Sequence, residues 1–235
     1  MCRGRVRARP GPSARRSGRT RLEGPRLMLA VLAGAAPDGD PNTLARIVTP
    51  GCLLIAVDGG AGLCLAAGLT PDLVVGDMDS VDPHTLTALE LRGVELVKVP
   101  AEKDFNDLQL GVDEALARGA TSLTATGVVG GRVDHLLCNL GTLQTDLPVS
   151  VVERDVTIDF LGASRSGCVV SGDDVTFSVV ALGGECTVSV TGARWPLDRA
   201  VLEPLSSLGL SNRVADDDAH IAVHRGRCVV VTVRA

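Results

Sequence analysis

Five short apolar runs, each ending at a cluster of glycine or charged residues, lie before residue 136 and constrain the fold more than any other feature. Near-continuous apolar runs bounded by turn residues are typical of strands buried on both faces, as in a parallel sheet covered by helices. Helix-like segments alternate with the runs, which predicts right-handed crossovers. Because ligands bind beyond the carboxyl ends of parallel strands, we expect the polar clusters to meet at one site. The runs are 27–33, 53–58, 72–75, 94–99 and 122–126.

After about residue 148 the pattern changes to short β-rich runs separated by Gly, Asp and Ser turns. Such a pattern predicts an antiparallel sandwich or barrel. We therefore expect an α/β protein. A Rossmann-like domain over 28–147, with a parallel sheet and helices on both faces, is followed by an all-β sandwich domain over 148–235.

Residues 1–27 hold nine of the 23 Lys and Arg residues but one of the 28 Asp and Glu residues. We expect this leader to be disordered. It fits an organelle transit peptide, a basic arm for nucleic acid, or sequence upstream of a true start at Met28. The remainder has 14 basic and 27 acidic residues, a net charge of −13, which argues against a nucleic-acid-binding body.

No apolar run approaches the roughly 20 residues of a membrane-spanning helix, so we expect a soluble protein with no membrane partner. The seven cysteines are scattered, odd in number and without a CxxC pair. This argues against a zinc site or a disulfide framework and fits a reducing, cytoplasmic location. Most of the cysteines fall in apolar runs, where they are expected to act as small buried hydrophobes.

Two carboxylates, Asp77 and Asp79, follow the third apolar run. Gly76 supplies backbone freedom, so both acids can reach one cation. The alternative is a turn whose acids cap the following helix, 82–92. For the pair, between a buried strand and a helix, we favour the metal interpretation.

Asp104 and Asp107 lie three positions apart where the next helix begins, directly after Lys103. This spacing places them on neighbouring positions of the first turn. The helix N-terminus partly offsets their charge, so the alternative is dipole compensation, worth about 0.5 kcal/mol each. Their expected position at the same sheet edge as Asp77 and Asp79 favours a shared metal site.

A glycine-rich turn, 127–135, follows the fifth run. Its backbone N–H groups and Arg132 are suited to hold phosphate oxygens at a helix start. His135 and Asn139 share a helix face, and for each a structural hydrogen bond is the simpler interpretation. After the second run, Asp58 is suited to bind a metal, to bind a ligand hydroxyl, or to cap the next helix.

Six carboxylates are therefore expected to crowd one edge, with Lys103 and Arg132 as the accompanying cations. Like charges about 4 Å apart repel by roughly 4 kcal/mol at an effective dielectric of about 20. A divalent metal would relieve this repulsion and let a polyphosphate approach, and hard oxygen ligands favour Mg²⁺ over zinc. The acids are Asp58, Asp77, Asp79, Asp104, Asp107 and Asp134.

The only tryptophan, Trp195, lies before a proline in the β-rich half. A sole Trp beside Pro is usually a core or domain-interface residue. Alternatively, its ring face receives a flat cationic ligand.

In this order the motifs resemble those of the thiamine pyrophosphokinase (thiamine diphosphokinase) family over about residues 28–235. Each segment alone is weak evidence, but the ordered set is specific. Two features depart from the family pattern: Gly62, where many relatives have Asn, and the Arg-rich leader. The matching segments are 58–61, 68–72 with 76–80, 103–107, 127–135, 195–197 and 211–212.

The resemblance implies that a pyrophosphoryl group passes from ATP to the hydroxyl of thiamine, giving thiamine diphosphate and AMP, with Mg²⁺ as cofactor. It implies a nucleotide-binding catalytic domain over 28–147 and a thiamine-binding sandwich over 148–235. It also implies a homodimer whose active sites lie between subunits.

The residues implied for each role are as follows. Metal ligands are Asp77, Asp79, Asp104 and Asp107; the catalytic set is Asp77, Asp79, Asp107 and Arg132, with Asp79 or Asp107 helping to deprotonate the hydroxyl. Nucleotide-binding residues are Asp58, Gly59, Gly60, Lys103, Asp104, Gly130, Arg132, Asp134 and His135; thiamine-binding residues are Trp195, Ser211 and Asn212.

Three alternatives stay open. The chain can be a non-catalytic nucleotide- or thiamine-binding protein, although every metal carboxylate is present. It can be a Mg²⁺-dependent phosphatase of the DxDxV type with Asp77 as covalent nucleophile, although no convincing GDxxxD motif follows. It can also be a pyrophosphokinase acting on a pterin alcohol, against which Trp195 and the C-terminal domain argue.

Overall fold

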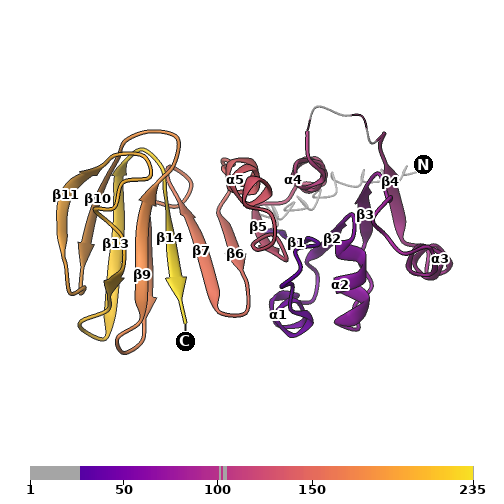
Figure 1. Cartoon of the computed structure of the whole chain (residues 1–235), viewed down its shortest axis with the longest axis horizontal. Coiled ribbons are helices and arrows are strands. Elements are labelled where there is room, and N and C mark those ends of the chain that lie inside the picture. The colour runs from indigo at the N-terminus through magenta and orange to yellow at the C-terminus, as the bar shows by residue number, and fades with distance from the viewer. Residues whose placement is uncertain (1–26, 101, 103–104, 235) are drawn as a thin grey trace, which may run out of the picture.

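The computed structural model describes residues 27–100, 102 and 105–234. Lys103 and Asp104, two members of the predicted site, lie outside the described residues, as do residues 1–26 of the predicted leader. The described chain forms an α/β part and a β-sandwich that follow one another along the long axis of the molecule (Figure 1).

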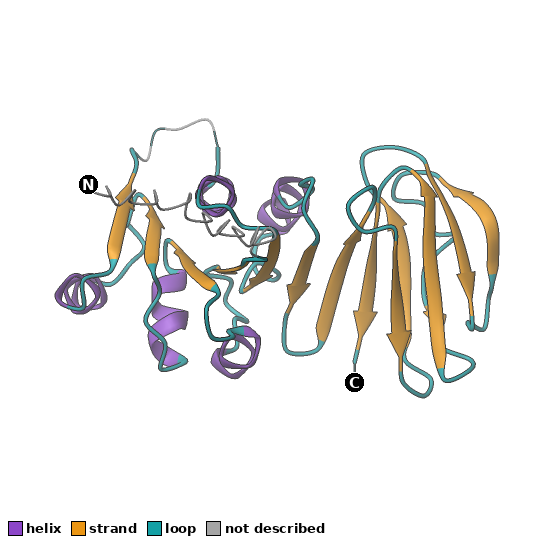
Figure 2. Ribbon diagram, turned by 180° about the vertical axis from the view of Figure 1, so that it is seen from behind, coloured by secondary structure: helices purple, strands orange, loops and turns teal. Residues whose placement is uncertain are grey.

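The N-terminal half is a parallel sheet with helices on both faces, as predicted. Helices α1 to α3 lie on one face, and α4 and α5 lie on the other (Figures 1 and 2). The strands are β1 (Leu29–Ala33), β2 (Leu53–Val57), β3 (Leu73–Gly76), β4 (Glu95–Lys98) and β5 (Ser122–Thr126). The helices are α1 (Pro41–Ile47), α2 (Gly60–Ala66), α3 (Pro83–Leu91), α4 (Asp107–Ala117) and α5 (Val133–Thr142).

The strand order reverses beside β1. The parallel strands lie in the order β4-β3-β2-β1-β5-β6, so the chain leaves β1 toward one edge and later returns to pair β5 with its other side. The connections after β1 and β5 therefore run to opposite faces and leave a crevice between them. Such a switch point is where open α/β sheets bind ligands.

The central strands are buried on both faces, which confirms the interpretation of their continuous apolar sequence. Leu32 of β1 packs in one core with Val112 of α4. Its neighbour Val31 packs in the opposite core with Leu44 of α1 and Cys64 of α2. Successive strand residues point to opposite faces, so both faces need apolar side chains.

The C-terminal half is a β-sandwich, as predicted, but its larger sheet continues the parallel one. Strand β6 (Val149–Val152) pairs parallel with β5 and antiparallel with β7 (Val156–Leu161), giving one ten-stranded sheet. A four-stranded sheet, β11-β10-β13-β8, forms the second layer. The remaining strands are β8 (Gly167–Ser171), β9 (Thr176–Ala181), β10 (Cys186–Thr191), β11 (Leu197–Leu202), β12 (Asn212–Arg213), β13 (Asp218–Arg225) and β14 (Cys228–Val233).

Strands β8, β11 and β12 lie outside the short β-rich runs of the sequence, which are 149–154, 156–162, 175–182, 186–192, 220–225 and 227–233. Strands β8 and β11 are the two edges of the smaller sheet, and β12 ends the larger one. Edge strands such as β11 carry charged side chains, here Asp198 and Arg199, which weaken the apolar alternation.

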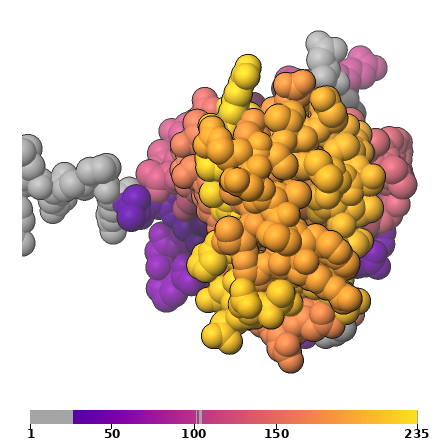
Figure 3. Space-filling view, turned by 90° about the vertical axis from the view of Figure 1, so that its left-hand side faces the viewer, coloured from indigo at the N-terminus to yellow at the C-terminus, as the bar shows by residue number. Residues whose placement is uncertain are grey.

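The sandwich stands at one end of the molecule. Figure 3 looks along the long axis from this end and shows the C-terminal strands in front of the α/β part. Among the described residues, no helix is both long and apolar enough to cross a membrane.

Candidate functional site

A cavity of about 470 Å³ opens at the switch point of the sheet. Its walls come from the turns after β1, β2 and β5 and from the starts of α4 and α5. Gly34 and Pro37 line it on one side, Gly127 and Gly130 on another, and Asp58 on a third. The segments that the sequence pattern expects to meet do meet here.

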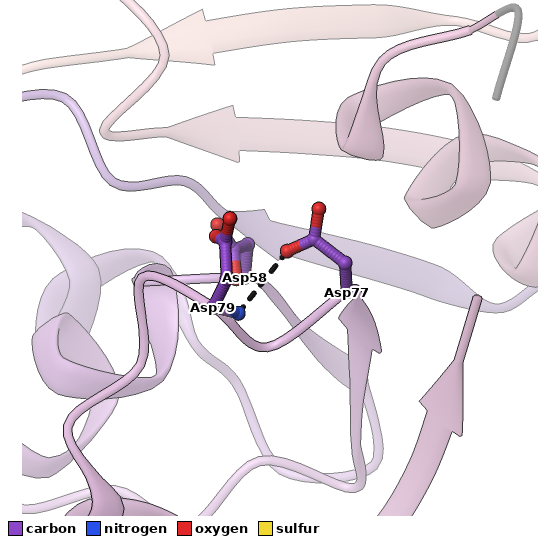
Figure 4. Close-up of side chains that lie close together, drawn as sticks. All are labelled: Asp58, Asp77 and Asp79. Atoms are coloured by element: carbon purple, nitrogen blue, oxygen red, sulfur yellow. Dashed lines mark hydrogen bonds between the residues drawn. The ribbon is translucent and has the colours of Figure 1, made fainter. Parts of the chain in front are cut away.

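Three carboxylates gather beside this cavity. Asp58 follows β2, and Asp77 and Asp79 follow β3; one carboxylate oxygen from each lies within 4.8 Å of the others. Figure 4 shows the three side chains converging, with the backbone N–H of Asp79 donating to Asp77 Oδ1 at 3.1 Å. The backbone N–H of Asp58 donates to Val75 O at 2.8 Å, which ties the end of β2 to β3. The predicted cluster of Asp58, Asp77 and Asp79 is therefore present.

Gly76 permits this crowding and brings a fourth acid close. Its φ is +142°, and a Cβ there would lie 3.1 Å from Asp58 Cβ and 3.2 Å from Asp107 Oδ1. A larger residue would be strained and would push both acids away. The first residue of α4 therefore joins the cluster at the end of β3, as predicted.

The cluster is electrostatically unfavourable without a cation. The pKa of Asp79 lies above its usual range, first because of a hydrogen bond with Asp77 and next because of that residue's charge, with burial and the charges of Asp58 and Asp107 adding to the effect. Oδ2 of Asp58 accepts a hydrogen bond from Ser80 Oγ. Its Oδ1 is buried and has no hydrogen-bond partner among the described residues.

These observations fit a hard divalent cation. A buried carboxylate oxygen without a donor costs free energy, and a metal ion would satisfy it. An all-oxygen donor set of converging carboxylates suits Mg²⁺ rather than zinc.

Helix capping does not explain the acids after β2 and β3. The N-cap of α3 is Asp82, which accepts from the N–H of Thr85 at 2.9 Å. Helix α2 has Gly59 at its N-cap and no side-chain cap. The capping alternative was therefore wrong for Asp58, Asp77 and Asp79.

The glycine-rich turn differs from the prediction. The N–H groups of Gly127, Val128 and Val129 donate to the carboxylate of Glu153, at 3.0, 3.0 and 3.1 Å. The prediction that these backbone groups hold phosphate was wrong, because a side chain of the protein already occupies them. Gly130 and Arg132, further along the turn, also line the cavity.

Arg132 lies at the mouth of the cavity, with 71% of its side chain exposed. It donates to Asp134 through two hydrogen bonds of 3.1 and 2.5 Å. The first of the causes that lower the pKa of Asp134 to about 2 is this hydrogen bonding from Arg132. Asp134 thus orients Arg132 and is not itself in the wall of the cavity.

Helix α5 supplies two more predicted residues. Asn139 donates to Val128 O at 3.0 Å and accepts from Asn106 Nδ2 at 3.3 Å, so the prediction of a structural hydrogen bond is confirmed. His135 lines the cavity.

The glycines after β2, Gly59 and Gly60, pack closely against the end of β1 and the turn that follows it. A Cβ on Gly60 would lie 1.9 Å from Ala33 O, so only glycine lets α2 begin against the end of β1. A Cβ on Gly59 would lie 3.0 Å from Ala35 Cβ. Both glycines shape the wall from behind and are not part of its lining.

The predicted thiamine-binding residues form a second group, on the sandwich. Trp195 is 52% exposed, so the core interpretation was wrong, and the guanidinium of Arg194 lies 5.1 Å from its ring centroid. The buried side chain of Asn212 donates to Trp195 O at 2.7 Å and accepts from Trp195 N at 3.1 Å. Asn212 thus fixes the backbone of Trp195. The exposed Ser211 is the preceding residue, with φ +55°.

One chain does not bring the two groups together. Trp195 lies between β10 and β11, whereas the carboxylates follow β2 and β3. These strands lie toward opposite ends of the molecule (Figure 1).

Glu153 is the residue of this region that sequence reasoning missed. It directly follows β6, at the same edge of the sheet as the other strand-end acids. The rule that identified Asp58 and Asp77 would have found it if β6 had been assigned to the parallel sheet.

Two family models match the chain, one in each half. Residues 45–151 match the family model described as "Thiamin pyrophosphokinase, catalytic domain", and residues 169–228 match "Thiamin pyrophosphokinase, vitamin B1 binding domain". The chain is 25% identical over 184 residues to a thiamine pyrophosphokinase of Bacillus subtilis, covering 76% of this chain and 86% of that protein.

Solved structures show the same fold. A crystal structure of thiamine pyrophosphokinase from Bacillus subtilis aligns with a TM-score of 0.76 at 21% identity, over 88% of this chain and 99% of that one. A thiamin pyrophosphokinase from Candida albicans aligns with a TM-score of 0.69 at 16% identity, over 88% and 90% of the two chains.

Proposed function

The chain belongs to the thiamin pyrophosphokinase family, and we propose that it transfers the pyrophosphoryl group of ATP to the hydroxyl group of thiamine. The observation that carries the proposal is the carboxylate cluster at the switch point, in a chain that also matches the vitamin B1 binding domain. The cavity beside the cluster has the volume of a small-ligand pocket. The phosphatase and the purely binding alternatives are not favoured by these matches.

Mg²⁺ is the proposed cofactor. Asp58, Asp77 and Asp79 would hold it, with Asp107 beside them. When bound, the ion would neutralise charge on the transferred phosphates, which is the main requirement of phosphoryl-type transfer.

The chain's own residues provide positioning. Arg132, held by Asp134, faces the cavity and is suited to a two-pronged contact with a phosphate. Asp79 and Asp107 are our candidates for accepting the proton of the thiamine hydroxyl, because both belong to the cluster that surrounds the proposed ion.

We also propose that the protein is a homodimer whose sites form between subunits. Trp195 and the carboxylates lie apart in one chain, and a second copy would bring one group to the other. Helix α5, at the cavity, has no buried residue, and Val133 and Leu137 are 69% and 59% exposed. Apolar side chains of this kind at a site are typical of an interface.

A cytoplasmic location is proposed from the cysteines. The six described cysteines are free thiols. Free thiols suit a reducing compartment.

The reaction is tested by its products. Incubated with ATP, Mg²⁺ and thiamine, the protein is expected to release AMP in step with thiamine diphosphate, because both transferred phosphates leave together. Separation of nucleotides and thiamine phosphates by chromatography measures both. ADP formed with thiamine monophosphate would contradict the proposal, and a phosphorylated Asp77 would favour the phosphatase alternative.

Trp195 is expected to stack on thiamine. Trp195→Ala should then raise the KM for thiamine about five- to thirtyfold, the equivalent of a lost cation–π contact of ~1–2 kcal/mol, while the KM for ATP stays the same. Because the chain has one Trp and no Tyr, thiamine should also quench the protein's fluorescence.

The control for this variant is Trp195→Phe, which keeps an aromatic face and should give an intermediate KM for thiamine. A purely structural Trp would show a different pattern. Its replacement by Ala would lower the melting temperature and leave the KM for thiamine unchanged.

A further inference from the structure

The side chain of Glu153 fills a ring of hydrogen-bond donors behind the cavity. Its Oε2 accepts from Thr126 Oγ1 at 3.1 Å and Gly127 N at 3.0 Å; its Oε1 accepts from Val128 N at 3.0 Å and Val129 N at 3.1 Å. Successive backbone N–H groups of this kind form an anion-binding nest. Here the anion is a carboxylate from the neighbouring strand, so the nest is closed to a phosphate.

The turn held by Glu153 is in backbone contact with the opposite wall of the cavity. Gly34 N donates to Thr126 O and Ala36 N donates to Gly127 O, both at 2.8 Å. A Cβ on Gly34 would lie 2.4 Å from Gly127 O, which shows how closely the two turns pack. Any shift of the turn after β5 would therefore move the turn after β1 as well.

The next residue, Arg154, contacts the start of α1, the helix that follows the turn after β1. Its guanidinium lies 3.6 Å from Asp40 Oδ1. Asp40 is the N-cap of α1 and accepts from Thr43 N at 3.2 Å, so it fixes the end of the loop that begins at Gly34. The β6–β7 turn thus contacts the elements on both sides of the switch point.

We propose that Glu153 is a positioning residue for the nucleotide. It touches no reacting atom; it sets the path of the turn that carries Gly130 and Arg132 into the cavity. This inference rests on the proposed function in that it takes ATP as the ligand of the cavity. It extends that function because Glu153 lies in the β6–β7 turn, at the start of the sandwich segment, and is proposed to affect nucleotide binding from there.

The test is Glu153→Gln, with Asp155→Asn as the matched control. A glutamine amide has one oxygen, so in either orientation its NH₂ group faces two donors that the carboxylate accepted. Asp155 lies in the same turn, is exposed, and its carboxylate makes no hydrogen bond or ion pair with a described residue. The control therefore removes the same charge without opening the nest.

For Glu153→Gln we expect the KM for ATP, and the Kd of MgATP measured by calorimetry without thiamine, to rise about tenfold, as for buried donors left unsatisfied. The KM for thiamine should stay within twofold of wild type, which a general loss of structure would not produce. If Glu153→Gln does not fold, Arg154→Gln should fold, because the side chain of Arg154 is 67% exposed. This variant should raise the Kd of MgATP about threefold, in line with the loss of a weak ion pair that has one exposed partner.

Failure of the positioning role and failure of the proposed reaction would give different results. If wild type and Asp155→Asn bind MgATP and Glu153→Gln binds it equally well, the positioning role is overturned. The same result for Arg154→Gln overturns it if Glu153→Gln cannot be folded. If wild type binds MgATP but makes no AMP, the proposed reaction fails, and the calorimetric comparison still decides the role of Glu153.

Discussion

Asp79→Asn is expected to lower kcat by about a hundred- to a thousandfold, the scale seen when a charged or polar group aimed at the reacting centre is removed. Asp79 belongs to the cluster with Asp58 and Asp77, whose oxygens lie within 4.8 Å of one another. An amide keeps the shape of the side chain but loses the charge that a cation needs. Asp107→Asn should have an effect of similar size. Steady-state turnover with saturating ATP and thiamine measures both.

The same variants should not lose stability in the absence of metal. A hydrogen bond with Asp77, followed by that residue's charge, raises the pKa of Asp79 in the folded protein. A carboxyl group whose pKa is raised by folding stabilises the fold when protonated, and this contribution is lost as pH rises through the folded pKa. When ionised, Asp79 therefore opposes folding. The melting temperature of metal-free Asp79→Asn should equal or exceed that of wild type.

The response to added Mg²⁺ distinguishes the loss of a metal ligand from a general loss of structure. It should raise the melting temperature of wild type, because a ligand that binds only the folded state stabilises it, and it should raise that of Asp79→Asn less. Glu90→Gln, which removes one exposed charge on α3 away from the cluster, should respond like wild type. Unchanged turnover and unchanged Mg²⁺ response in Asp79→Asn and Asp107→Asn would show that the metal site lies elsewhere.

The strand-end acids show how much of the site the sequence determines. Asp58, Asp77 and Asp107 lie far apart in the chain, yet each directly follows a buried strand or begins a helix at the same edge. The spacing of the apolar residues and the positions of the turn residues are enough to predict that these acids lie together. Gly76 was also predictable, because two acids at one strand end need a backbone that a side chain would obstruct.

Other features depend on pairings that no local pattern encodes. Glu153 reaches the turn after β5 only because β6 continues the parallel sheet, whereas its sequence reads like the antiparallel strands that follow. Asn212 fixes Trp195 from 17 positions away, through hydrogen bonds that appear only once β12 pairs with β9. The Rossmann-like fold class therefore follows from the periodicity of the apolar residues. The contacts of Glu153 and Asn212 follow only from the way in which the strands pair in three dimensions.

The separation of Trp195 from the carboxylates leads to the last prediction. If each active site takes its carboxylates from one subunit and its Trp195 from the other, two defective variants should complement each other. In a mixed dimer of Asp79→Asn with Trp195→Ala, one site carries both defects and the other carries neither. Random exchange makes half of the dimers mixed, so activity should recover to roughly a quarter of wild type, as expected for a two-fold symmetric interface.

The experiment is a subunit exchange assayed at a thiamine concentration well below the wild-type KM, where Asp79→Asn is nearly inactive and Trp195→Ala keeps only about a fifth to a thirtieth of wild-type activity. Exchange is promoted by dilution or mild denaturant and verified by mass spectrometry of the mixed dimer. Mixing Asp79→Asn with Asp107→Asn is the matched control. Both changes affect the carboxylate group, so every site in that mixture is defective and no activity should return. Recovery in neither mixture, with mixed dimers present, would mean that Trp195 and the carboxylates do not share a site across the interface. Trp195 would then have to reach the cluster within one chain, against the arrangement of β10, β11, β2 and β3.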